Sequence, residues 1–138
     1  MTKQLKNLIF ATALLCGSAV SLPPPAEAQE ALPQRNGKYY SDAMQLARLL
    51  GRAHSVRVTC NGRSDQFWRL YMQEMLDLEA PVQGRFRDSM ARAFNDAYAS
   101  ESARRNWCDD AAVNAEASYA AEGRVLAEGL AKYYFKRQ

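Results

Sequence analysis

A single histidine and a few carboxylates are the side chains of this 138-residue chain that could carry out acid–base chemistry. His54 is the only histidine, and histidine is the side chain whose ordinary pKa lies near neutrality. The residues three and four positions from it along a helix include no carboxylate, so an orienting partner would have to come from another segment, with Glu79 or Glu116 as candidates. The sequence therefore favours a packed or interfacial role for His54 over a catalytic one.

Paired carboxylates are a second source of chemistry, because two of them can hydrolyse a glycosidic bond. Glu74, Asp77 and Glu79 lie close together in the sequence. On a helix, the apolar stripe of this segment would turn Glu74 and Asp77 outward and leave Glu79 nearer the apolar face. Solvated surface acids are the more common arrangement. Glu79 and His54 are therefore the candidate catalytic residues if the protein is a glycan hydrolase, which is the alternative to a non-enzymatic protein.

Motifs of known catalytic and cofactor sites are absent from the sequence, including G-x-S-x-G, a glycine-rich phosphate loop and H-E-x-x-H. With one histidine and three cysteines, a zinc site would need almost every one of these side chains. The net charge of +3 is too small to indicate a nucleic-acid partner. We expect no metal, no cofactor and no nucleic acid.

The densest basic region lies between residues 85 and 105. Its arginines are Arg85, Arg87, Arg92, Arg104 and Arg105. An exported protein could use such a region to contact anionic lipid, glycan or another protein. A solvated helix face is the alternative, and the interleaved acids Asp88, Asp96 and Glu101 favour it.

The first 28 residues have the order of a secretory signal peptide. Lys3 and Lys6 precede the uncharged, apolar or small residues 8–22. Three prolines follow, and small residues lead to Ala28, after which we predict cleavage. The apolar stretch is shorter than the roughly 20 residues of a membrane span. We therefore expect a periplasmic or secreted protein without a transmembrane segment in its mature chain.

The cysteines predict one disulfide in the mature chain. Removal of 28 of the 138 residues would leave 110, would remove Cys16, and would lower the net charge from +3 to +2. Leu15 is too large for the residue that precedes a lipid-modified cysteine, so we do not expect a lipoprotein. Cys60 and Cys108 then form an even pair in an oxidising compartment. Their disulfide would close a loop worth about 4 kcal/mol in the chain-entropy model.

Four helices would have to position these residues. Apolar residues recur at helical spacing in 41–59, 64–80, 82–98 and from about 109 onward, and no segment has the alternation of a strand. Ser41 and Ser64 are the expected N-caps of the first two helices. Residues 29–40 are expected to be a flexible lead-in, and 99–106 a loop. We predict an all-α domain over residues 41–138, a small bundle of about four helices clamped by one disulfide.

Aromatic residues at both ends of this domain allow two interpretations. Tyr39 and Tyr40 lie at the beginning, and 133–135 is a run of three aromatic residues near the end. One-sided helices cannot bury all of them, so they could form an exposed patch for a partner. Alternatively, the two ends pack on each other.

The order of several short motifs resembles a small family of exported alphaproteobacterial proteins of unknown function. The motifs are Leu50-Gly51-x-x-His54-x-x-Arg57 before Cys60, Trp68-Arg69-x-x-Met72, Leu76-Asp77-x-Glu79-Ala80-Pro81, Phe94-Asn95-x-x-Tyr98, Cys108 and Gly123-Arg124-x-Leu126-Ala127. The resemblance covers nearly the whole mature chain. It implies an exported helical protein without an assigned activity, and it implies that the residues to test first are His54, Arg57, Trp68, Glu79, Asn95 and Tyr98.

Together these features favour a non-enzymatic periplasmic or secreted protein that acts by binding in cell-envelope maintenance. Its partner would be an envelope protein or glycan, with Arg57, Trp68, Asn95 and Tyr98 as candidate binding residues. Asn95 and Glu79 lie on or beside apolar stripes, which suggests buried hydrogen bonds or a site. The alternatives are a small envelope-glycan hydrolase that uses Glu79 and His54, and a periplasmic stress chaperone. The sequence leaves the oligomeric state open.

Overall fold

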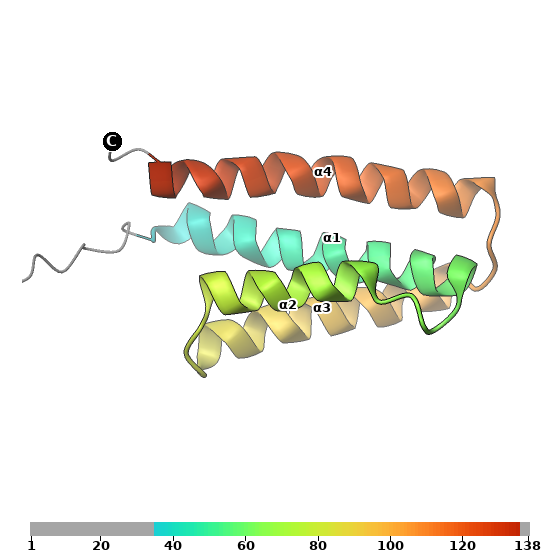
Figure 1. The fold of residues 1–138 in the computed structure, drawn as a ribbon, viewed down its shortest axis with the longest axis horizontal. Helices are drawn as coiled ribbons and strands as arrows, with labels where there is room; N and C mark the ends of the chain where they lie inside the picture. The colour runs from blue at the N-terminus through green and yellow to red at the C-terminus, as the bar shows by residue number, and fades with distance from the viewer. Residues whose placement is uncertain (1–34, 136–138) are drawn as a thin grey trace, which may run out of the picture. The chain divides into compact units, whose positions relative to one another are not determined.

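The structure, a computed structural model, describes residues 35–135 and forms four helices in this range (Figure 1). They are α1 (Gly37–Asn61), α2 (Phe67–Glu79), α3 (Arg85–Arg104) and α4 (Asp110–Phe135). The described residues contain no strand, so the predicted all-α fold is confirmed. The predicted signal peptide and residues 29–34 of the predicted lead-in lie outside this range.

The first helix begins earlier than the sequence predicted. The Asn36 side chain accepts a hydrogen bond from the backbone N–H of Tyr39 at 3.0 Å, so Asn36 and not Ser41 caps α1. Residues 37–40, predicted as part of the lead-in, form its first turn. The helix ends at Gly62, whose φ of 90° lies in the left-handed region that favours glycine.

The boundaries of α2 and α3 also differ from those predicted. Asp65, not Ser64, accepts a hydrogen bond from the Phe67 backbone N–H at the start of α2. α3 begins at Arg85 instead of residue 82 and continues through most of the predicted 99–106 loop. In this polar-looking stretch Glu101 lies on the buried face of α3, where its carboxylate is paired, so the stretch packs as part of the helix. The predicted start of α4 is close to the observed one, since Asp109 accepts a hydrogen bond from the Ala112 backbone N–H at 2.7 Å.

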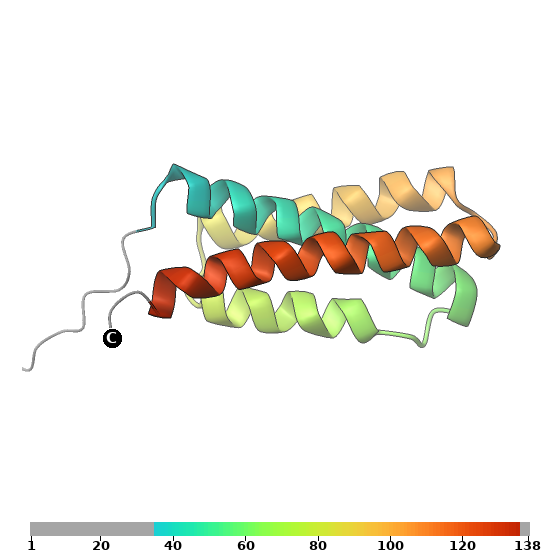
Figure 2. The same cartoon turned by 90° about the horizontal axis from the view of Figure 1, so that it is seen from above.

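α1 is the central helix of the bundle. It packs along α3 and α4 and, less extensively, along α2. Figures 1 and 2 show that the helices run roughly parallel or antiparallel to one long axis, with α2 and α4 both antiparallel to α1. The backbones of α2 and α4 do not approach each other closely. As a consequence, a space remains between these two helices above α1.

The core lies where α1 meets its three neighbours. Its buried side chains are Tyr39, Ala43, Leu46, Ala47, Leu50, Met72, Met75, Leu76, Ala80, Met90, Ala93, Phe94 and Leu130. α1 and α3 approach each other closely at Gly51, where an added Cβ would lie 2.2 Å from the carbonyl oxygen of Phe94. Glycine is required there because α1 and α3 pack nearly backbone to backbone.

A disulfide between Cys60 and Cys108 joins the end of α1 to the segment before α4, which confirms the predicted pairing. The aromatic ends of the domain pack on each other as far as they are described. Tyr39 is fully buried, and its ring lies 5.6 Å from that of Tyr133. The side chains of Tyr134 and Phe135 lie outside the described part of the structure.

Candidate functional site

An open, mostly apolar groove of about 750 Å³ lies between α2 and α4. α1 forms its floor, with side chains that include Leu46, Leu50 and Ala53. One wall is α2, which contributes large side chains such as Tyr71 and Leu78. The other wall is α4, whose contribution is mainly small: Ala120, Gly123, Ala127 and Ala131. This size and lining are typical of ligand and partner sites.

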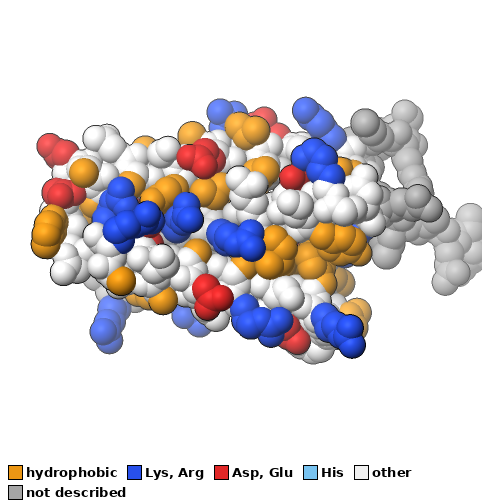
Figure 3. Space-filling view, turned by 180° about the vertical axis from the view of Figure 1, so that it is seen from behind, with side chains coloured by type: hydrophobic (Ala, Val, Ile, Leu, Met, Phe, Trp, Pro, Cys, Tyr) orange, Lys and Arg blue, Asp and Glu red, His pale blue; other side chains and the backbone are white. Residues whose placement is uncertain are grey.

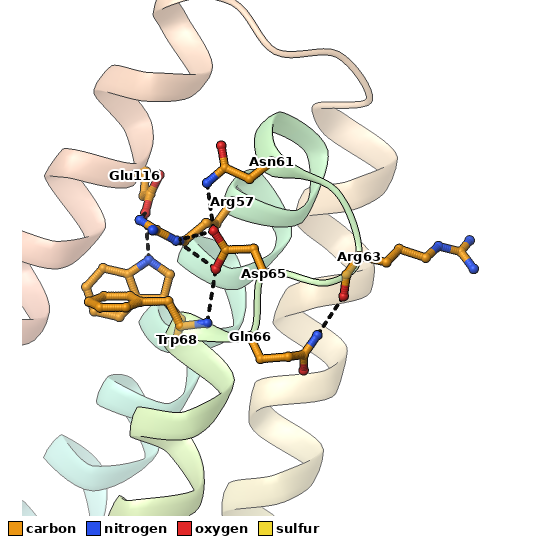
Figure 4. Close-up of polar contacts among 8 residues, drawn as sticks. Arg57, Asn61, Arg63, Asp65, Gln66, Trp68 and Glu116 are labelled. Carbon is orange, nitrogen blue, oxygen red and sulfur yellow. Dashed lines mark hydrogen bonds and ion pairs between the residues drawn. The ribbon is translucent and has the colours of Figure 1, made fainter.

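A polar network surrounds Trp68, which lines the groove near the start of α2 (Figure 4). The indole N–H of Trp68 donates to Glu116 of α4 at 2.7 Å. Arg57 of α1 donates to the same carboxylate oxygen at 3.3 Å and to both oxygens of Asp65, at 2.9 and 2.8 Å. Asn61 donates to Asp65 at 2.7 Å. The network therefore links α1, α2 and α4 at one point.

Asp65 is the most perturbed carboxyl group of this network. Hydrogen bonds from the Asn61 side chain, the Phe67 backbone N–H and Arg57 stabilise its ionised form. They lower the pKa of Asp65 from 3.8 to about 2. Arg57 and Trp68, two of the predicted binding residues, are both held in this network. Their polar groups therefore help to fix α1, α2 and α4 relative to one another.

Glu79 lies at the opposite end of the groove. The Tyr39 hydroxyl donates to its carboxylate, and Arg35 is ion-paired to the same carboxylate at 3.7 Å. Arg35 also donates to the backbone carbonyl of Glu79. The charged groups near both ends of the groove are thus already paired within the protein.

Two charged side chains that take no part in these end networks stand on the rims of the groove, midway along it. Glu74 projects from α2 and makes no hydrogen bond or ion pair among the described residues. Arg124 projects from α4, where it pairs at 2.9 Å only with Glu128 of the next helical turn, and both side chains are mostly exposed. Exposed pairs of this kind contribute little to stability, so Arg124 is available to a partner.

His54 does not belong to the groove. It is 4% exposed and packs against α3, with ring centroids 5.7 Å from Phe94 and 5.4 Å from Tyr98. Its Nδ1 has no hydrogen-bond partner among the described residues. Burial first, and then the charge of Arg69, lower the pKa of His54, so its ring is neutral at neutral pH.

The structure does not bring His54 and Glu79 together. Glu79 contacts Tyr39, and 15 residues of α1 separate Tyr39 from His54, which corresponds to about 22 Å along the helix axis. His54 faces α3, whereas Glu79 faces the groove. An acid–base pair must reach one substrate, so this arrangement argues against the hydrolase alternative.

The remaining two predicted binding residues lie on α3. Tyr98 is half-buried against His54. Asn95 is exposed, so the expectation that its amide makes buried hydrogen bonds is wrong. Of the predicted site residues, the structure therefore groups Arg57 with Trp68 and His54 with Tyr98, and leaves Glu79 and Asn95 apart from both pairs.

A buried acid that sequence reasoning missed lies on α3. Glu101 is 0% exposed and accepts hydrogen bonds from Arg104, Arg105 and, at 3.1 Å, from the Tyr119 hydroxyl of α4. Burial alone would raise the pKa of Glu101, but the hydrogen bonds from Arg104 and Tyr119 and the two arginine charges lower it overall. The only available signal was the Arg-Arg pair one turn after this acid, a spacing that allows ion pairs within a helix.

Most of the predicted basic region is structural. Arg87 donates to the carbonyls of Leu76 and Ala80 at the end of α2 and pairs with Asp77. A smaller recess of about 410 Å³ between α1 and α3 holds guanidinium groups without ion pairs among the described residues, those of Arg48, Arg52 and Arg92, beside Asp96. Lys and Arg side chains are spread over the face opposite to that of Figure 1, among acidic and apolar ones (Figure 3).

Within residues 35–135, no three His, Cys, Asp or Glu side chains are close enough to hold a metal ion together. The helices in this range are also too short or too polar to cross a membrane.

Comparisons with known proteins identify a family but no activity. No curated protein and no solved structure is significantly similar to the chain. The family model described as a protein of unknown function, DUF2385, matches residues 38–134, which include nearly all of the four helices and both groove walls. The chain therefore belongs to the DUF2385 family.

Proposed function

We propose that this protein acts by binding in the cell envelope, and that its partner occupies the groove between α2 and α4. The observation that carries the proposal is the groove itself, an open apolar space of about 750 Å³. Contiguous exposed apolar surface is costly for a monomer and is typical of interaction sites. The rim side chain of Leu78, which is 66% exposed, extends this surface outside the groove.

The polar networks at the two ends of the groove support a binding role. The contact of Trp68 with Glu116 and the contact of Tyr39 with Glu79 fix side chains next to the groove without contributing a reactive group. A site whose walls are held in place before binding loses less entropy when a partner arrives. The separation of His54 from Glu79 favours this role over glycan hydrolysis.

Export supports the envelope as the place of action. The first 28 residues read as a signal peptide, and disulfides such as Cys60–Cys108 persist in oxidising compartments. Mass spectrometry of the protein from its native host tests this part directly. We expect a mature chain that begins at Gln29, and a chain that retains residues 1–28 in the cytoplasm would contradict export.

Site-specific photo-crosslinking in intact cells tests the groove. A photoreactive amino acid at Ala127 faces the groove, whereas the same amino acid at Val125 lies on the exposed side of α4 and serves as the control. We expect one or a few discrete adducts from position 127 that are absent from position 125. Equal adducts at both positions would contradict the proposal, and a continuous smear from position 127 would favour the stress-chaperone alternative.

A further inference from the structure

We propose that the occupant of the groove is an amphipathic helix of a partner protein, about three turns long, with a basic residue on one flank and an acidic residue on the other. This inference rests on the proposed binding function and specifies its ligand. It follows from three properties of the groove: its length, the sizes of its wall residues and the positions of the charged side chains on its rims.

The length of the groove matches three helical turns. On α2 it extends from Trp68 to Glu79, and on α4 from Tyr119 to Ala131. At 1.5 Å per residue, these walls are about 16 and 18 Å long. A helix of about twelve residues covers this length and would present apolar anchors at positions i, i+3 or i+4, i+7 and i+11.

The widths of the two walls suit a helix that enters between α2 and α4. Helix axes pack 8–10 Å apart depending on the side chains at the contact. The small residues of α4, such as Ala120 and Gly123, permit a close approach on one side. Tyr71 and Leu78 of α2 line the groove on the other side and are exposed, at 49% and 66%. A helix placed there would cover both walls and the α1 floor.

The positions of the charges favour a helix over a single acyl chain. A fatty acid or lipid carries its charge at one end of the chain and would need a free cation at one end of the groove. Here Arg57 and Arg35, at the two ends, are paired within the protein. The charges available to a ligand, Glu74 and Arg124, stand on opposite rims midway along the groove. Only an elongated ligand with charges on both flanks complements this pattern, and an amphipathic helix has this form.

A selection experiment tests the inference without knowledge of the natural partner. A displayed library of fourteen-residue peptides, with apolar residues at helical spacing and randomised flanks, is selected against the purified full chain. Counter-selection uses Ala127→Trp, which fills the groove, and Val125→Trp is the control variant that leaves the groove open. We expect enriched peptides that bind the protein and Val125→Trp equally, lose at least tenfold in affinity for Ala127→Trp, and become helical when bound.

A charge exchange then tests the orientation of the best peptide. Glu74→Lys is expected to weaken binding about two- to fivefold, and the matching Lys→Glu change in the peptide is expected to restore it. Glu122→Lys makes the same change of charge on α4 at a residue that does not line the groove, and we expect it to have no effect. If no peptide depends on an open groove, or if the charge exchange never restores binding, the inference is wrong.

Three further measurements separate this failure from a failure of the proposed function. Palmitate or a lysophospholipid that binds the protein but not Ala127→Trp, while no peptide does, would leave the groove a binding site and replace the helix by an acyl chain. Dimers that dissociate in Leu78→Lys would identify a second copy as the occupant. If neither peptide nor lipid binds and the photo-crosslinker at position 127 gives no adduct, the proposed function fails as well.

Discussion

Substitution of Gly51 by alanine tests the packing that holds the groove floor in place. The new Cβ would lie 2.2 Å from the Phe94 carbonyl oxygen and 3.0 Å from its carbonyl carbon, both of them backbone atoms of α3. No side-chain rotation can relieve these contacts, so α1 and α3 must separate. Overpacking of this kind costs about 1–3 kcal/mol. Alanine recovers about 1 kcal/mol of helix propensity, so the net destabilisation should be about 0–2 kcal/mol, and the clash with backbone atoms places it toward the upper end.

Two other glycines provide matched controls for this substitution. At Gly129 of α4 an added Cβ would meet nothing within 4 Å, so Gly129→Ala should stabilise the protein by about 0.5–1 kcal/mol. At Gly123 the nearest atom is Leu46 Cδ1 at 3.3 Å, the end of a flexible side chain, so Gly123→Ala should be close to neutral. The predicted order of stability is therefore Gly129→Ala, then Gly123→Ala, then Gly51→Ala.

Urea denaturation followed by circular dichroism at 222 nm, with the disulfide intact, measures this order. A difference of 1 kcal/mol corresponds to about 4–8 °C in Tm for a domain of 60–100 residues, so thermal melts should separate Gly51→Ala from Gly129→Ala clearly. If Gly51→Ala were as stable as Gly129→Ala, the close packing of α1 on α3 would be refuted, and with it the position of the groove floor.

The disulfide, Asp65 and His54 give three further predictions. Replacement of both Cys60 and Cys108 by serine should lower the free energy of unfolding by about 4 kcal/mol, measured by urea denaturation against the oxidised protein, and a loss below 1 kcal/mol would contradict the chain-entropy account. Because the pKa of Asp65 is lower in the folded than in the unfolded chain, its contribution to stability is complete above about pH 4 and is lost as the pH falls toward 2. Asp65→Asn should therefore make the loss of stability at acid pH less steep. An unchanged loss would show that this carboxyl group does not make the hydrogen bonds described. Because the pKa of His54 is lower in the folded than in the unfolded chain, the stability of the protein should fall as the pH drops below about 6.5, and His54→Phe should remove this dependence. The same substitution should leave stability at neutral pH unchanged or higher, because it removes a buried nitrogen without a hydrogen-bond partner among the described residues. Marked destabilisation at pH 7 would indicate a hydrogen bond at that nitrogen.

The number of helices and the disulfide could be predicted because each has a local signal. Apolar residues at helical spacing identified all four helices. An even pair of cysteines in a mature chain that we predict to be exported identified the bond between Cys60 and Cys108. The end of α3 had no such signal. Glu101 looks like a surface residue, and its burial depends on Tyr119, which lies 18 residues later and on another helix.

The groove could not be predicted from the sequence. Its floor residues, such as Leu46 and Leu50, belong to the same apolar stripe as the core residues. Whether such a residue also lines the groove depends on the distance between α2 and α4, which the sequence does not show. One signal was present, however. α2 has large apolar residues on more than one face, with Met72 and Met75 buried and Leu70 and Leu78 exposed. A short helix of this kind is apolar over more surface than one core can cover.

The position of α4 has a consequence for engineering. Its backbone packs along α1 alone, and the side-chain hydrogen bonds that join it to α2 and α3 within residues 35–135 are those of Glu116 and Tyr119. Larger residues at Ala120 or Ala127 would therefore narrow the groove without entering the seam between α1 and α3. The α4 residues that line one wall can be substituted while the residues of the opposite wall and of the floor stay unchanged. The bundle thus offers a scaffold whose specificity could be varied from one helix face, while the covalent link at Cys108 keeps the start of that helix attached to α1.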